Sequence, residues 1–184
     1  SGIFPPGGQS CISGTRILVH EDIIAEFTGR LAELAGQAKV GPPDDPKSQI
    51  GPMANKPHYE HVLSRIEAAV EAGHELLLDG RSECRERGYF IGPTIFLNVP
   101  NESDLAQNEV FGPVASTEAW TDEQDAIRTA NDTIFGLAAG IWSRDVAKAM
   151  RMADLIEAGT VYINNYFNAA TQSPVGGFKQ SGYG

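Results

Sequence analysis

The chain has few cysteines, little positive charge and no long apolar run, and each shortage excludes a class of protein. Its 184 residues include only Cys11 and Cys84, too few for the disulfide framework of a small secreted domain. A bridge between the two stays open, although the charged stretch "RSECRERG" favours an incidental surface thiol at Cys84. No apolar run approaches the roughly 20 residues that cross a bilayer, and no signal-peptide pattern opens the chain.

Charge and composition narrow the choice to an ordinary globular domain. The 14 lysine and arginine residues are outnumbered by 24 aspartate and glutamate residues, which gives a formal net charge of -10. Without a basic cluster we expect neither a nucleic-acid surface nor a membrane partner. Hydrophobic residues make up 41% of the chain, enough for one domain with a real core. We therefore predict a cytoplasmic protein.

Amphipathic segments alternate with short β-rich runs along the chain. Apolar spacing predicts helices over 20–41, 56–74 and 143–159. The last of these carries on one face the residues Val146, Ala149, Met150, Ala153 and Ile156. Another helix is predicted to start at Thr121, where Gln124 completes a capping box. The strands are predicted at "RILV", "ELLLDG", "TIFLNV", "VASTEAW", "LAAGIW" and "TVYINN". This order is typical of one α/β domain, a three-layer sandwich whose largely parallel open sheet is covered by helices on both faces.

Cys11 has unusual neighbours for a core cysteine. In "PPGGQSCISGTR" it is surrounded by small and polar residues rather than by an apolar run. A nucleophilic cysteine must be reachable, partly ionised and close to N–H donors, and small neighbours allow all three. By itself the pattern leaves two interpretations open, a nucleophile and an inert thiol in a turn.

A second cluster, "AQNEVFGPVAS", places Glu109 and Phe111 before a Gly-Pro turn. A carboxylate accepts two hydrogen bonds at once, so Glu109 suits a ribose diol, and Phe111 suits packing against a flat ring. A surface acid and a core phenylalanine that bound a turn would give the same pattern.

Familiar phosphate and metal motifs do not match. The glycine-rich "SPVGGFKQSGYG" lacks the spacing of a P-loop, and no G-x-G-x-x-G follows a predicted strand. The histidines show no metal-ligand spacing with the cysteines, so we predict no metal site. The histidines are His20, His58, His61 and His74.

Taken in order, the motifs are far more specific than each is alone. "GQSCISGTR", "NEVFGPV" and "SPVGGFKQSGYG" occur in this order in the aldehyde dehydrogenase superfamily, which the chain resembles over essentially its whole length. The stretches "RGYFIGPTIF", "NDTIFGLAAGIWSRD" and "AGTVYINNY" are also similar to that family's catalytic domain. The resemblance implies that residues 1–184 are such a domain, with the corresponding fold.

The resemblance also implies a reaction. Cys11 matches the family nucleophile, whose thiolate attacks an aldehyde to form a thiohemiacetal held partly by the Cys11 backbone N–H. Hydride passes to NAD or NADP, and water cleaves the resulting thioester to the carboxylic acid. Two alternatives stay open: transfer of the acyl group to coenzyme A or phosphate, and a non-catalytic binding or assembly module of the same fold.

Further site residues follow from the resemblance alone. Glu109 matches a ribose-binding glutamate, Phe111 an aromatic residue beside the nicotinamide, and His58 a polar position near the cofactor. The residues that match the lining of the substrate tunnel are Phe167, Ala169 and Val175.

The departures from the family pattern predict a fragment. The family's nucleotide-binding domain, with its general-base glutamate, an oxyanion-hole asparagine and a cofactor lysine, normally precedes such a segment, and a strand used in subunit pairing follows it. The chain instead begins at Ser1 without methionine and ends in "KQSGYG". We expect it to fold but to be inactive alone, and to form a homodimer or homotetramer at full length with a small aldehyde as substrate.

Overall fold

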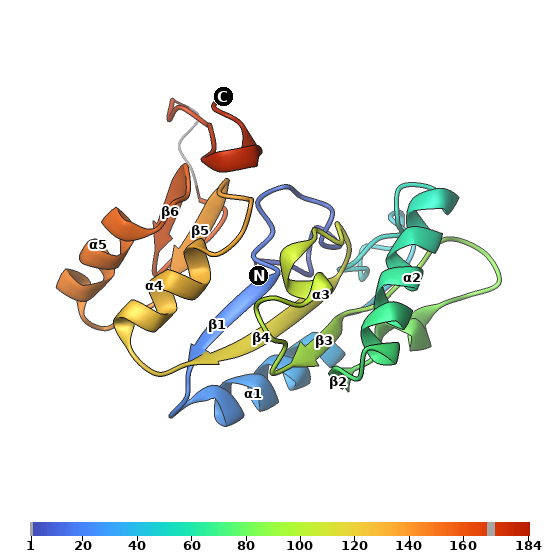
Figure 1. Cartoon of the computed structure of the whole chain (residues 1–184). Coiled ribbons are helices and arrows are strands. Elements are labelled where there is room, and N and C mark those ends of the chain that lie inside the picture. Colours follow the sequence, from blue (N-terminus) through green and yellow to red (C-terminus); the bar gives the residue numbers. More distant parts are fainter. Residues whose placement is uncertain (1, 169–171) are drawn as a thin grey trace.

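A computed structural model describes residues 2–168 and 172–184 (Figure 1). Within these ranges, each predicted β-rich run forms a strand. The strands are β1 Arg16–His20, β2 Glu75–Leu78, β3 Thr94–Leu97, β4 Val114–Trp120, β5 Ala138–Ile141 and β6 Thr160–Ile163. The α-helices are α1 Ile24–Gly36, α2 Lys56–Glu71, α3 Asp104–Gln107, α4 Glu123–Asn131 and α5 Val146–Leu155, and the short 3-10 helices are Gly80–Glu83 and Lys179–Ser181.

The strands pair mostly in parallel, which confirms the predicted α/β fold. One sheet has the order β1-β4-β3-β2, in which only β2 runs antiparallel to its neighbour. Hydrogen bonds place β5 and β6 in a separate parallel pair. Figure 1 shows this pair with α4 and α5 beside the larger sheet. The division into two sheets was not apparent from the strand pattern.

Both faces of the larger sheet are covered. Neighbouring residues of a strand point to opposite faces, and both Ile95 and Phe96 of β3 are fully buried. Phe96 packs in a cluster with Val62 and Ile66 of α2. On the other side, α1 contacts both β1 and β2, so it crosses the sheet (Figure 1). This packing produces the three layers that the alternation of helices and strands predicts.

Two predicted helix boundaries were wrong. Helix α1 ends at Gly36 rather than at Gly41, because the chain leaves it to form an isolated β-bridge further on. Helix α4 is capped by Asp122 rather than by Thr121, since the Asp122 carboxylate accepts the N–H of Asp125 at 2.9 Å. The Asp125 carboxylate in turn accepts the N–H of Thr121, the residue before the cap, at 3.2 Å, so Thr121 and Gln124 do not form the predicted capping box.

The predicted apolar face of the last helix was only partly right. Ala149 of α5 is buried as predicted, but Val146 and Met150 are 62% and 52% exposed, and Met152, outside the predicted face, is buried. The helix meets β5 and β6 along the narrower side that carries Ala149 and Met152. The apolar stripe of α5 is therefore wider than the side of this helix that contacts β5 and β6 in the described part of the chain.

A partly buried polar network joins the larger sheet to helix α4. Arg16 at the start of β1 donates to the side-chain oxygen of Asn101 and, at 2.9 Å, to the carbonyl of Thr129 in α4. Asn101 is only 8% exposed and donates to the Asp132 carboxylate at 2.6 Å. Burial lowers the pKa of the Arg16 guanidinium, and the nearby Asp132 charge partly opposes this shift. The end of α4 is thereby attached to β1.

We expect Asn101→Leu to lower the free energy of unfolding by about 1–3 kcal/mol, because the partly buried Arg16 loses an acceptor while the side-chain size is kept. Urea denaturation monitored by circular dichroism measures the loss. Gln124→Ala, on the exposed face of α4, is the control and should stay within about 0.5 kcal/mol of the wild type. Equal stability of Asn101→Leu and wild type would show that the network does not stabilise the fold.

Candidate active site

Cys11 lies in a tight turn of the loop that precedes β1. The Ser13 N–H donates to the Ser10 carbonyl at 2.9 Å, which closes the turn around Cys11. The Cys11 side chain is exposed. The structure therefore places the thiol where a dissolved molecule can reach it.

The second cysteine differs from its prediction. Cys84 is half-buried and packs against the main core cluster, so the interpretation as a surface thiol was wrong. The Cys84 thiol, together with burial, raises the pKa of Tyr59 to about 12. No disulfide joins the two cysteines, and both are free.

Glycine at position 8 brings two distant motifs into contact. Gly7 and Gly8 both have positive φ angles, +64° and +66°. A Cβ placed on Gly8 would lie 1.7 Å from the Gly112 carbonyl oxygen and 2.8 Å from the Pro113 nitrogen. The backbone of the Cys11 loop thus rests directly on the backbone that follows Glu109 and Phe111.

The Gln9 side chain attaches the same loop to the start of α2. Its amide nitrogen donates to the Pro52 carbonyl at 3.2 Å, and its oxygen accepts the Ala54 N–H at 2.9 Å. The next residue, Asn55, caps α2 by accepting the His58 N–H at 2.9 Å. The sequence analysis did not single out Gln9, because nothing in the local pattern shows where its amide bonds.

Glu109 and Phe111 lie on either side of a buried residue, Val110. Val110 between them is 6% exposed and belongs to the main core cluster, while Glu109 is exposed and Phe111 half-buried. Phe111 has a positive φ of +56°, and its carbonyl accepts a hydrogen bond from His58 Nε2 at 2.8 Å. Nε2 therefore carries the proton, and this ring nitrogen of His58 bonds the backbone of Phe111. Partial burial raises the pKa of Glu109.

The residues predicted to line a substrate tunnel are only partly placed. Phe167 has a positive φ of +63°, and its ring lies edge-on to that of Tyr166 with centroids 5.2 Å apart. Val175 is 69% exposed, and its carbonyl lies against Gly184 at the chain end. Ala169 lies outside the described residues.

Tyr166 is a residue that the sequence analysis missed. A Cβ placed on Gly2 or on Gly14 would lie 3.3 Å from its ring or hydroxyl, so Tyr166 fills the space beside the Cys11 loop. The sequence shows that Gly2 and Gly14 are small, but both are far from Tyr166 along the chain. No local pattern therefore indicates that they contact it. Through Tyr166, the segment that carries Phe167 comes next to the Cys11 loop.

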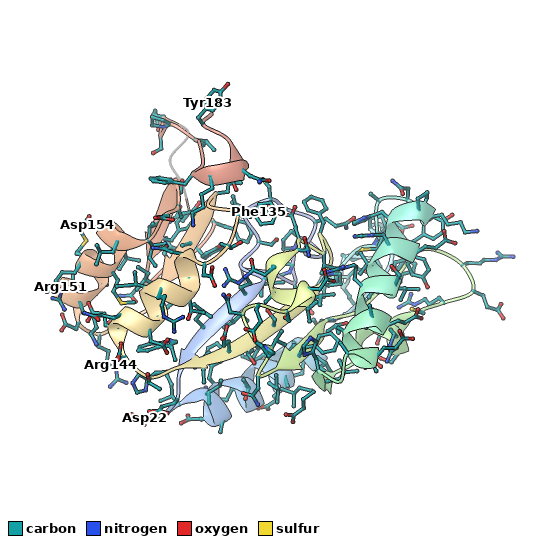
Figure 2. The ribbon with its side chains drawn as sticks, in the orientation of Figure 1. Asp22, Phe135, Arg144, Arg151, Asp154 and Tyr183 are labelled. Atoms are coloured by element: carbon teal, nitrogen blue, oxygen red, sulfur yellow. The ribbon has the colours of Figure 1, made fainter. Side chains whose placement is uncertain are left out.

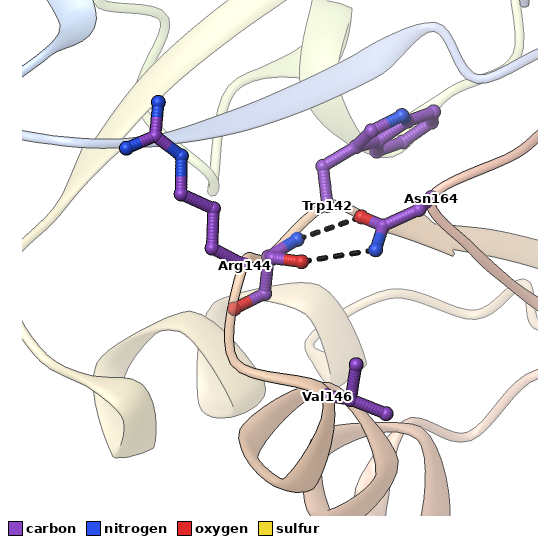
Figure 3. A pocket seen from close by; sticks show the side chains of 5 residues that line it. Trp142, Arg144, Val146 and Asn164 are labelled. Atoms are coloured by element: carbon purple, nitrogen blue, oxygen red, sulfur yellow. Dashed lines mark hydrogen bonds between the residues drawn. The ribbon is translucent and has the colours of Figure 1, made fainter.

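A surface hollow of about 560 Å³ contains none of the predicted site residues. It is open to solvent and is lined by Trp142, Ser143, Arg144, Val146 and Asn164 (Figure 3). The Asn164 amide bonds both the N–H and the carbonyl of Ser143 at 2.9 Å, which closes the end of the small sheet. At the far end of the chain, Tyr183 projects outward (Figure 2).

Among the described residues, no three histidine, cysteine, aspartate or glutamate side chains gather in a way that could hold a metal ion. In the same part of the chain, no helix is long and apolar enough to cross a membrane.

The class of protein follows from these features. The chain is an α/β domain that presents an exposed thiol in a turn next to a carboxylate–aromatic turn. The profile of the aldehyde dehydrogenase family matches residues 1–184, and the chain belongs to this family. The resemblance inferred from the motifs is thereby confirmed.

Named aldehyde dehydrogenases align with the whole chain. It is 41% identical over 186 residues to a betaine aldehyde dehydrogenase of Brucella anthropi, covering 100% of this chain and 38% of the relative. It is also 41% identical over 184 residues to the NADP/NAD-dependent aldehyde dehydrogenase PuuC of Escherichia coli, covering 100% of this chain and 37% of the relative. The chain thus spans little more than a third of the length of these relatives.

Solved structures of aldehyde dehydrogenases also superpose on the chain. The NAD-dependent aldehyde dehydrogenase of Sinorhizobium meliloti superposes with a TM-score of 0.96 at 37% identity, covering 100% of this chain and 36% of the other. Betaine aldehyde dehydrogenase of Staphylococcus aureus, solved in complex with NAD+, superposes with a TM-score of 0.92 at 35% identity, covering 98% of this chain and 36% of the other.

We expect Gly8→Ala to destabilise the chain far more than Gly7→Ala. Both substitutions force a side chain into positive φ, at a cost of about 1–2 kcal/mol. Only Gly8→Ala also pushes a Cβ into backbone, since the Cβ of Gly7→Ala would meet the movable Gln9 side chain at 3.2 Å. Thermal unfolding measures the loss of stability in each variant. An equal loss of stability in the two would rule out a rigid contact at Gly8.

Glu109 should make stability depend on pH. Its raised pKa favours the neutral form in the folded chain, so its contribution is present at low pH and is lost as pH rises through the folded pKa. Glu109→Gln should therefore match the wild type near pH 3 and be more stable at pH 7, by chemical denaturation at each pH. Glu33→Gln, at an exposed position of α1, is the control. A difference that stays constant with pH would contradict this.

Proposed function

We propose that residues 1–184 are the catalytic domain of an NAD(P)-dependent aldehyde dehydrogenase that oxidises small aldehydes to carboxylic acids. The observation that carries the proposal is the backbone contact of Gly8 with Gly112. It sets the turn of the exposed Cys11 beside the turn of Glu109 and Phe111, so one ligand can meet both. The names of the relatives, NADP/NAD-dependent and betaine aldehyde dehydrogenase, support the same reaction.

Cys11 is the proposed nucleophile. Its thiolate attacks the aldehyde carbon, forming a C–S bond and moving the carbonyl electron pair onto oxygen. Within the described residues the Cys11 N–H donates no backbone hydrogen bond, so it is available to this oxyanion. Loss of the aldehyde hydrogen as hydride turns the adduct into a thioester, and attack by water then releases the acid and the thiolate.

The residues beside this turn fit a dinucleotide. When bound, NAD or NADP supplies the acceptor for the hydride. The exposed Glu109 carboxylate can accept two hydrogen bonds from a ribose diol, and the half-buried Phe111 ring offers a flat apolar surface next to it. His58 supports this pair by bonding the Phe111 carbonyl. In the proposal, Glu109, Phe111 and His58 form the part of the cofactor site that this chain contributes.

The aldehyde side of the site remains a prediction that rests on fewer contacts. Phe167 lies next to Tyr166, which packs on the Cys11 loop, so Phe167 is a proposed substrate contact. Ala169 and Val175 are proposed with it. A cytoplasmic location, a homodimer or homotetramer at full length, and inactivity of the isolated chain also remain predictions.

The proposal is tested in a protein that carries this chain at the length of its relatives. NADH and NADPH formation is followed over a panel of small aliphatic, amino and betaine-type aldehydes. We expect Cys11→Ala to lower turnover at least about a thousandfold, because the covalent route is lost. Cys84→Ala, the other free thiol, is the control and should keep turnover within about twofold.

The products decide between the alternatives. Acid formation without added acceptor supports the hydrolytic reaction. Turnover only with coenzyme A or phosphate would replace it by acyl transfer. If no turnover is seen under any condition, the remaining interpretation is a non-catalytic binding or assembly module of the same fold. Dinucleotide reduction by the isolated 184-residue chain would contradict the predicted inactivity of the fragment.

A further inference from the structure

We propose that Tyr166 is a positioning residue for Cys11 and fixes one end of the turn that carries the thiol. The inference rests on the proposed function only in taking Cys11 as the reacting group. It adds a residue that acts through the backbone of the Cys11 loop rather than by touching the dinucleotide.

Tyr166 packs where the Cys11 loop begins and ends. The Gly14 N–H donates to the Gly2 carbonyl at 3.2 Å, so these residues close the base of the loop. A Cβ on Gly2 would lie 3.3 Å from Tyr166 Cδ1, and a Cβ on Gly14 would lie 3.3 Å from the Tyr166 hydroxyl. Both positions therefore accept the tyrosine closely because neither carries a side chain. Displacing Tyr166 removes support from both ends of the base.

The other side of Tyr166 is held by the small sheet. A Cβ on Gly140 of β5 would lie 2.7 Å from Tyr166 Cδ2, so the ring fits closely against this strand. The Trp142 ring stacks on it with centroids 6.0 Å apart, and the Tyr162 ring lies 5.0 Å away. Burial, with a smaller contribution from Tyr162, raises the pKa of Tyr166 to about 12.

The Cys11 turn is consequently held at two ends by two different sheets. On one side Gly8 rests on Gly112, which leads into β4 of the larger sheet. On the other side Gly14 rests on Tyr166, which follows β6 of the small sheet. The position of the thiol thus depends on how the two sheets lie relative to each other, because Tyr166 contacts both the small sheet and the base of the Cys11 loop.

Tyr166→Ala tests the inference by amide hydrogen exchange at the base of the loop. We expect exchange at Ser13 and Gly14 to become at least about tenfold faster, because their bonds lose the packed ring, while Gln9 stays within about twofold. Tyr166→Phe, which keeps the ring, should restore slow exchange. Trp120→Ala removes an aromatic ring at the opposite end of the β1–β4 pair and controls for a general loss of stability.

A kinetic readout separates positioning from mere stabilisation. At the length of its relatives, Tyr166→Ala should lower kcat at least about tenfold and leave the KM for the dinucleotide within about twofold, because Tyr166 supports the thiol and not the Glu109–Phe111 turn. Equal loss in Trp120→Ala, or an unchanged kcat, would overturn the positioning role.

Two measures keep the test decisive. If Tyr166→Ala does not fold, Gly140→Ala crowds the Tyr166 ring, together with the Trp142 ring that stacks on it, from the β5 side without altering the sequence of the loop, and the same exchange rates are measured. Unchanged exchange at Ser13 and Gly14 in a folded variant would overturn the inference. Because exchange is measured without aldehyde or dinucleotide, it stays informative even if Cys11→Ala shows that the proposed reaction is wrong.

Discussion

The contact of the Gly8 backbone with the Gly112 carbonyl is the constraint on which the site depends. No side chain fits between them, since a Cβ on Gly8 would lie 1.7 Å from that oxygen. On its other side Gly112 faces Val62 of α2, where an added Cβ would lie 2.8 Å from a methyl group. Three segments are thus stacked at minimum separation: the loop of Cys11, the Gly-Pro turn and the second helix. Glycine serves here by its lack of volume as much as by its freedom in φ.

Two of the proposed site residues have a strained backbone. Phe111 and Phe167 both have positive φ, which is costly for a bulky side chain. Such conformations persist only where the surroundings determine them, and they are common at functional sites. His58 bonds the carbonyl of Phe111, and the ring of Tyr166 packs edge-on to Phe167. The two aromatic residues proposed for cofactor and substrate are therefore both held by neighbours that are not proposed to react.

The small sheet depends on the rest of the chain more than its strand order suggests. A pair of strands has too little area for a core of its own. Here β5 and β6 pack against α5, and Tyr166, which follows β6, contacts the Cys11 loop. The Arg16 network attaches the neighbouring α4 to β1. In the proposed role of Tyr166, the stability of the small sheet and the position of the thiol are coupled.

Sequence alone determined the features that depend on local pattern: the strands, the α/β class and the family. It also predicted the site residues Cys11, Glu109 and Phe111 from their motifs. It misplaced the cap of α4, the end of α1 and part of the apolar face of α5, because these depend on competition between neighbouring side chains and on which surface finds a partner. Only the tertiary structure decided that Gln9 and Tyr166 hold the Cys11 loop and that Cys84 is half-buried. The physical reason is that such contacts join residues far apart in the chain, and no local pattern records the distance between them.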